Sequence, residues 1–234
     1  MDYPARGQGG FTDHGGFRMA TDTNGKADVR LIQAVHNTFR TGLTRLMDAT
    51  TKLEPAALQS AVGPYWSFYS AILDFHHHNE DEEDFPLLVS YYPDIQPLVD
   101  ELGADHRQML EVMKNVDAAV DAFQKSPDLA NRDAINAAVV ELRDLFFPHL
   151  DREDAEVLPM YAKWIPHDVF AKLETKTLKS IPKPQMPYAV GALDETIRAT
   201  PEAERPEGPP LPVKIFLSLS WRKKWAGLVQ PMLT

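Results

Sequence analysis

The sequence predicts an all-α protein, an antiparallel four-helix bundle with a short fifth helix and a proline-rich C-terminal extension. Three observations support this prediction. Apolar residues recur at spacings of three and four over most of the chain, strand patterns are almost missing, and the long segments are joined by connections of a few to a dozen residues. Long amphipathic segments with short connections are typical of helical bundles.

The first three predicted helices each carry a histidine on the apolar face. Asp28 is a candidate N-cap for the first helix, in which His36 continues the apolar stripe. The second helix brings His76 to its apolar face, and the third does the same with His106. The three segments span about residues 28–46, 55–84 and 97–123.

The fourth predicted helix covers about residues 131–157 and continues its apolar face through His149 and Glu153. Pro148 lies inside this segment and predicts a local kink or bulge, because proline cannot donate the backbone hydrogen bond of a regular helix. A shorter fifth helix is expected near residues 166–178, on the outside of the bundle.

The composition of the two ends differs from that of the centre. Residues 1–27 hold six of the 12 glycines and indicate a flexible arm, whereas residues 28–180 form the predicted bundle. Residues 181–234 hold nine of the 19 prolines. We interpret them as a proline-rich strap and an amphipathic C-terminal segment, expected to pack on the bundle or on a second copy of the chain. The alternative for this basic, tryptophan-bearing segment is an anionic membrane or an acidic partner.

Charge and cysteine content exclude several classes of function. The formal net charge of -10 argues against binding to nucleic acid, and the sequence has no apolar run long enough for a transmembrane segment and no secretory signal pattern. We therefore expect a cytoplasmic protein. The 234 residues include no cysteine, so any metal must be held by nitrogen and oxygen ligands.

Two copies of one short motif stand out. In the first, Glu80 follows His76 by four residues and Pro86 follows it by ten; in the second, Glu153 and Pro159 follow His149 at the same spacings. Four residues advance about one turn on an α-helix, so the histidine and the glutamate of each copy share a face. Two such pairs facing each other would make a metal site.

The four core-facing histidines need a partner. A single histidine on an apolar face is usually a core residue, but one on each helix, two of them with carboxylates, leaves several polar groups in the core. Unpaired polar or ionised groups cost several kcal/mol there. A pair of metal cations supplies the missing partner, whereas a scaffold with buried histidines and no metal does not explain the carboxylates.

This ordered pattern over residues 28–165 resembles the hemerythrin-like (HHE cation-binding) family. The resemblance implies a di-iron centre, bridged by an oxo or hydroxo group and by two carboxylates. It makes Glu80 the first bridging carboxylate. The second is Glu153 or Asp154, because members of the family differ in this spacing; we favour Glu153, which repeats the spacing of the second helix. The resemblance implies that the terminal ligands are His36, His76, His106 and His149.

One position departs from the pattern of the family. Hemerythrins carry a second histidine four residues after the one on the third helix, and Leu110 occupies this position. The centre would then lack a ligand and have an open or water-filled position. Two other residues could fill it: His77, which follows His76, and Tyr69, which lies two helical turns earlier on the same face.

The open position decides between two functions. Iron suits mixed imidazole and carboxylate ligation with redox chemistry, and manganese or zinc are less favoured alternatives. With an exchangeable position, the centre is expected to decompose hydrogen peroxide in a catalase-like reaction. In the alternative, it reversibly binds or senses O₂, NO or iron without turnover. Leu110 favours peroxide chemistry, because a less saturated metal pair exchanges small ligands more freely.

Overall fold

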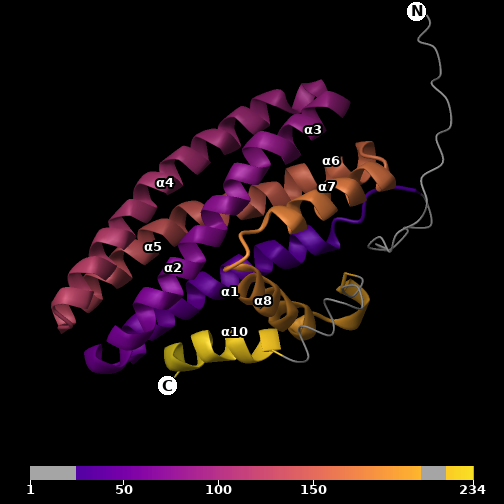
Figure 1. Ribbon diagram of the computed structural model, residues 1–234. Helices are drawn as coiled ribbons and strands as arrows, with labels where there is room; N and C mark the ends of the chain where they lie inside the picture. Colours follow the sequence, from indigo (N-terminus) through magenta and orange to yellow (C-terminus); the bar gives the residue numbers. More distant parts are fainter. Residues whose placement is uncertain (1–24, 207–219, 234) are drawn as a thin grey trace, which may run out of the picture.

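The computed structural model describes residues 25–206 and 220–233 and has the predicted all-α architecture. No β-strand occurs within these residues. The core is a bundle in which α1 packs against α2 and α5, and α4 packs against α2 and α5 (Figure 1). Its four long helices are α1 (Arg30–Lys52), α2 (Pro55–Asn79), α4 (Gln96–Lys125) and α5 (Leu129–Arg152).

The first two helices approach each other closely at Gly42. A Cβ atom at this position would lie 2.7 Å from the Tyr69 ring, so a larger residue would push α1 and α2 apart. The hydroxyl of Tyr65 donates a hydrogen bond of 2.9 Å to the carbonyl oxygen of Gly42. The N-cap of α1 is Val29 rather than the predicted Asp28, whose carboxylate nevertheless accepts from the backbone N–H of Arg30.

Two π-helical turns interrupt the bundle at the repeated motif. One spans Glu80–Asp84 and leads into α3 (Phe85–Tyr91), and the other spans Glu153–Val157 and leads into α6 (Leu158–Trp164). Each turn closes on a hydrogen bond to the carbonyl of its first glutamate, five residues back. A proline follows each turn as the second residue of the next helix, where its missing N–H and its ring oppose a regular α-helical continuation.

The predicted bulge therefore lies in a different place. Pro148 was expected to disturb the fourth helix, but α5 continues through it, and the π-helical turn begins only at Glu153. Pro64 likewise lies inside α2 without ending it. The prolines that coincide with a change of helical register are those that follow the two glutamates.

Residues beyond the bundle contain more helix than the sequence indicates. The predicted fifth helix is α7 (His167–Ser180), whose Phe170 is buried against α6. The predicted strap contains a 14-residue helix, α8 (Met186–Ala199). Its prolines do not prevent it, because Pro187 lies in its first turn, where proline is tolerated, and Pro201 lies beyond its end.

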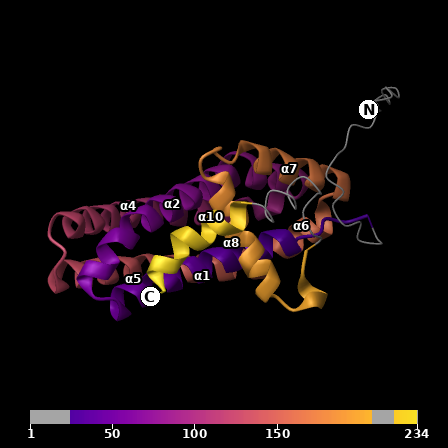
Figure 2. The same cartoon turned by 60° about the horizontal axis from the view of Figure 1, so that its bottom comes forward.

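The C-terminal helix α10 (Arg222–Val229) packs on α8 and α2 (Figure 2). Trp225 is only 6% exposed, and its indole N–H donates a hydrogen bond to Glu195. Arg222 forms an ion pair with Asp194. The predicted arm at residues 1–24 and much of the amphipathic segment, residues 207–219, lie outside the described part of the chain.

The described residues also contain the 3₁₀ turns Pro93–Ile95, Glu202–Glu204 and Gln230–Met232, and an isolated antiparallel β-bridge joins Lys26 and Pro166. None of the helices in the described ranges is long and apolar enough to cross a membrane.

Candidate metal centre

The predicted ligands converge inside the bundle, where one end of each long helix meets the π-helical turns. Of the six favoured ligands and His77, all but one are buried; the exception, His76, has 14% of its side chain exposed. The alternative bridge Asp154 has 18% of its side chain exposed. Six elements supply the favoured ligands and His77: His36 from α1, His76 and His77 from α2, His106 from α4, His149 from α5, and Glu80 and Glu153 from the first positions of the two π-helical turns.

Each glutamate lies between two histidines on different helices. One oxygen of Glu80 is 3.3 Å from Nε2 of His76, and the other is 3.6 Å from Nε2 of His106. Glu153 repeats this arrangement, with one oxygen 3.3 Å from Nε2 of His149 and the other 3.6 Å from Nε2 of His36. Both carboxylates therefore have one oxygen on each side of the cluster, which is the arrangement expected of carboxylates that bridge two metal ions.

The donors form two main groups that share the glutamates. Within each group, one donor atom of every residue lies within 4.8 Å of the others. The first group is His36, His76, Glu80 and Glu153, and the second is His106, His149, Glu80 and Glu153. Nε2 of His106 lies 3.0 Å from Nε2 of His149. Two imidazoles bound at about 2.1 Å to one ion and at a right angle would have about this separation.

Several buried nitrogen and oxygen atoms of the cluster have no hydrogen-bond partner within the described residues. This is expected of side chains whose partner is a metal ion. Within the cluster these atoms are Nε2 of His36, His76 and His77, Nδ1 of His149, Oε2 of Glu80 and both carboxylate oxygens of Glu153. Buried polar atoms are otherwise almost always paired. The residues present thus fit a centre of two cations with nitrogen and oxygen ligands.

His77 points inward and Leu110 does not. The His77 ring is buried and stacked on that of His106, with 4.2 Å between centroids, and the two form a third donor group with His149. Leu110 is 43% exposed, and Met109 is the buried residue of this turn. Position 110 therefore does not face the cluster, and a histidine is not missing from the core there.

Carboxylates outside the cluster form hydrogen bonds with two of the histidines. Nδ1 of His36 lies 2.6 Å from Asp154, and Nδ1 of His106 lies 2.9 Å from Asp81. Nδ1 of His149 has no hydrogen-bond partner within the described residues, and an oxygen of Asp105 lies 3.5 Å from it. An ionised carboxylate only accepts hydrogen bonds, so in His36 and His106 Nδ1 carries the proton and Nε2 keeps its lone pair for the centre. Such outer partners orient metal-binding histidines and raise their basicity.

The same contacts distinguish the two candidates for the second bridge. Glu153 is 1% exposed and lies among the histidines. Asp154 is turned outward and bound to His36, to Gln33 and to Arg40. Sequence reasoning missed the outer carboxylates Asp81 and Asp105, although Asp81 directly follows Glu80 as Asp154 follows Glu153, so the repeated motif contained that signal.

Two tyrosines lie close to the centre. The hydroxyl of Tyr69 donates a hydrogen bond of 3.0 Å to the carbonyl oxygen of Phe39, and burial raises the pKa of Tyr69 well above its usual value, so it is not presented as a phenolate. Tyr161 of α6 is also buried, and its hydroxyl has no partner in the described part of the chain. Burial and the charges of Asp84 and the two central glutamates raise its pKa. No sequence motif marks it.

Burial shifts the pKa of three of the central side chains. It lowers the pKa of His76 to about 3 and that of His77 well below its usual value, with smaller contributions from the neighbouring histidines. Both are therefore neutral near pH 7, the form that binds metal. Burial and the Glu153 carboxylate raise the pKa of Glu80 well above its usual value. A cation between the two glutamates would relieve this repulsion.

A helical bundle with two histidine groups joined by shared carboxylates defines a cation-binding protein. The family model "Hemerythrin HHE cation binding domain" matches residues 27–161, more than half of the chain, and the chain therefore belongs to this family. Comparisons with curated proteins and with solved structures gave no match. The protein thus carries a hemerythrin-like domain that binds cations, with a cluster of histidines and glutamates as candidate ligands.

Proposed function

We propose that the chain binds two iron ions and that this centre decomposes hydrogen peroxide to water and O₂. The observation that carries the proposal is the position of Glu80 and Glu153, each with one oxygen toward either side of the cluster. Iron fits a set of imidazoles and carboxylates without thiolates, and when bound it supplies Lewis acidity and the change of oxidation state that the reaction needs.

The two sides of the proposed centre differ in their number of ligands. With His77 included, the side of His106 and His149 offers three imidazoles in addition to the shared carboxylates. The side of His36 and His76 offers two. The under-ligated position, first inferred from Leu110, is therefore expected on the side of His76, which is also the most accessible of the proposed ligands.

The surrounding residues would control access and protons. Phe39 stacks on the ring of His76, with 4.9 Å between centroids, and Phe146 is fully buried beside His149, so both exclude bulk water from the cluster. Asp84 lines the cavity that reaches His76, and burial raises its pKa to about 7. Its carboxyl could accept and return a peroxide proton near neutral pH, which suits a general acid and base.

Oxygen evolution by protein loaded with iron tests the proposal. Two molecules of peroxide should yield two of water and one of O₂, at a rate proportional to bound iron across preparations of different iron content. Protein loaded with zinc is the control, since it keeps the fold and the ligands without a redox-active ion. A reversible visible band that depends on O₂ or NO, without peroxide turnover, would replace the proposal with the binding or sensing function. Substantially less than one metal per chain would exclude both.

A further inference from the structure

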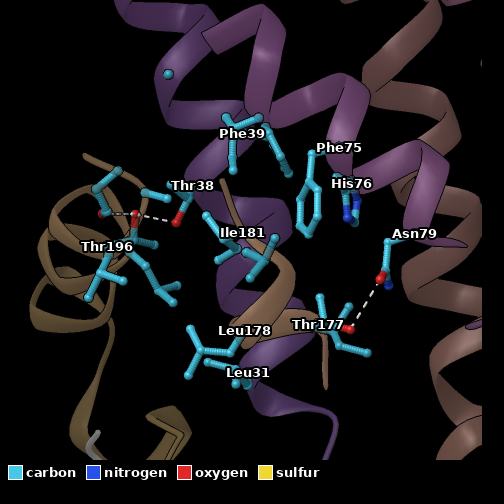
Figure 3. A pocket seen from close by; sticks show the side chains of 18 of the residues that line it. Leu31, Thr38, Phe39, Phe75, His76, Asn79, Thr177, Leu178, Ile181 and Thr196 are labelled. Carbon is cyan, nitrogen blue, oxygen red and sulfur yellow. Dashed lines mark hydrogen bonds between the residues drawn. The ribbon is translucent and has the colours of Figure 1, made fainter. Parts of the chain in front are cut away.

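A cavity of about 200 Å³ lies between the bundle and the helices that follow it. One wall comes from α1 and α2, and the other from α7, α8 and Ile181 between them. Figure 3 shows side chains from both walls around this space. The apolar side chains that line it include Leu31, Val35, Phe39, Ile72, Phe75, Leu173, Leu178, Ile181 and Leu193.

The inner end of the cavity reaches the proposed metal centre. His76 and Glu80 both belong to its lining. His76 is also the one proposed ligand that is not fully buried, with 14% of its side chain exposed. A molecule held in the cavity would therefore lie against the under-ligated side of the centre.

Two hydrogen bonds between side chains join the two walls of the cavity. The hydroxyl of Thr38 on α1 donates a hydrogen bond to that of Thr196 on α8, and Thr177 on α7 donates one to Asn79 on α2 (Figure 3). These pairs satisfy each other and leave the centre of the cavity to apolar side chains. Hydrogen bonds thus join the two walls on either side of the cavity.

The charges around the cavity favour a neutral occupant. Its described lining includes four acidic residues, Glu80, Asp84, Glu174 and Glu195, and one basic residue, Arg45, which is paired with Glu195. One buried oxygen of Glu174 has no hydrogen-bond partner within the described residues. An anion would lose its hydration here without gaining a free cationic side chain among the described residues, whereas a neutral molecule with one hydroxyl could bond to Glu174.

We propose that this cavity binds a neutral, largely apolar organic molecule with one hydroxyl group, of about the size of a single substituted aromatic ring, against His76 and Glu80. The volume supports this size, because an engineered apolar cavity of about 150 Å³ binds benzene. Burial raises the pKa of Glu174 to about 8, so its carboxyl is mostly neutral at pH 7 and adds no charge against such a ligand.

The helices that close the cavity lie outside the part of the chain that defines its family. The family model ends at residue 161, whereas α7 begins at residue 167 and α8 at residue 186. One wall of the cavity is therefore supplied by this chain's own extension, and the other wall, from α1 and α2, belongs to the family domain. Binding in the cavity does not require peroxide chemistry.

Isothermal titration calorimetry of the metal-loaded full chain tests the proposal with p-cresol, a neutral ring with one hydroxyl. We expect saturable binding at one site with a Kd below about 1 mM. The anion p-toluenesulfonate, which keeps the ring and the methyl group and is a weak metal ligand, should bind about ten-fold more weakly or not at all. Equal affinity for the two compounds, or no saturable heat with p-cresol, would overturn the proposal.

Variants that fill the cavity locate the binding. Leu178→Trp and the milder Ile181→Phe should each weaken p-cresol binding by about ten-fold or more. Leu129→Trp adds the same bulk at a position 54% exposed at the start of α5 and should leave the affinity within about two-fold. Unchanged binding in both filled variants, with unchanged circular dichroism, would contradict the cavity. Binding is read as heat, so loss of peroxide activity and loss of cresol binding remain separate outcomes.

Discussion

Nδ1 of His36 lies 2.6 Å from a carboxylate oxygen of Asp154, the residue that directly follows the central Glu153. Glu153 thus lies inside the cluster, whereas the adjacent Asp154 lies on the outer side of His36. Arg40 and Gln33 hold Asp154 from the other side. The His36 ring is therefore fixed, with Nε2 toward the centre.

Asp154→Asn should weaken metal binding without removing it. The amide can still contact His36, but it lacks the charge that raises the basicity of the ring, and the loss of such outer partners typically costs about 10-fold to 100-fold in metal affinity. Competition with a chelator measures the change. Asp151→Asn is the matched control, because Asp151 also pairs with Arg40 but is exposed and makes no described contact with His36. Equal losses in both variants would assign the effect to Arg40.

Glu80→Ala should reduce the metal content of the purified chain from about two ions to well below one, since Glu80 contributes an oxygen to both of the main donor groups. His149→Ala should lose metal as well, and both variants should be less stable because the remaining buried donors lose their partners. Elemental analysis and thermal unfolding measure the two effects. Glu82→Ala, at an exposed position in the same π-helical turn, should retain the full metal content.

Two variants test which residue completes the metal centre. His77→Ala tests whether His77 is a ligand, and Leu110→His tests whether position 110 could supply one. Removal of His77 should lower metal content or affinity, because its ring lies with His106 and His149. A histidine at position 110 should change neither, because Leu110 is 43% exposed. Metal-loaded spectra and elemental analysis of the two variants provide the comparison. A gain of metal affinity in Leu110→His would show that position 110 can turn inward.

Helical periodicity explains which parts of this site could be predicted from sequence. His76 and Glu80 are four residues apart in one continuous helical segment, so their common face follows from the repeat of 3.6 residues per turn. The orientation of Leu110 does not, because the rotation of α4 about its axis depends on packing against α2 and α5. His106 and Leu110 share a side of α4, yet only His106 faces the core.

The extension shows a second limit of sequence reasoning. Proline content predicted a strap over residues that include α8, because prolines were counted over the whole segment. Their positions matter more than their number, since Pro187 and Pro201 lie at the ends of the helix, where they cost little. The contact between α8 and α10, which buries Trp225, joins residues distant in sequence and has no local signal.

Gly191→Ala should loosen the packing of α10 on α8. A Cβ atom at position 191 would lie 2.6 Å from Cβ of Trp225, which is too close to the backbone to be relieved by a rotamer change. We expect a loss of about 1–3 kcal/mol in the free energy of unfolding, as for other overpacked sites. Gly227→Ala in α10 is the control, because its Cβ would meet no atom within 4 Å. It should be neutral or stabilise by up to about 1 kcal/mol.

Glu174→Gln should change how stability depends on pH. Burial raises the pKa of Glu174 to about 8 in the folded chain, above the usual value of 4.5, so the folded state binds more protons than the unfolded state between these values. This group therefore lowers stability progressively as pH rises from about 5 to about 8, and glutamine removes the loss. Relative to wild type, the variant should gain stability on the order of a few kcal/mol at pH 9 compared with pH 5. Thermal unfolding of both proteins across this range measures the difference, and the exposed Glu202→Gln should show none. A constant difference between wild type and Glu174→Gln at all pH values would show that Glu174 ionises normally in the folded chain.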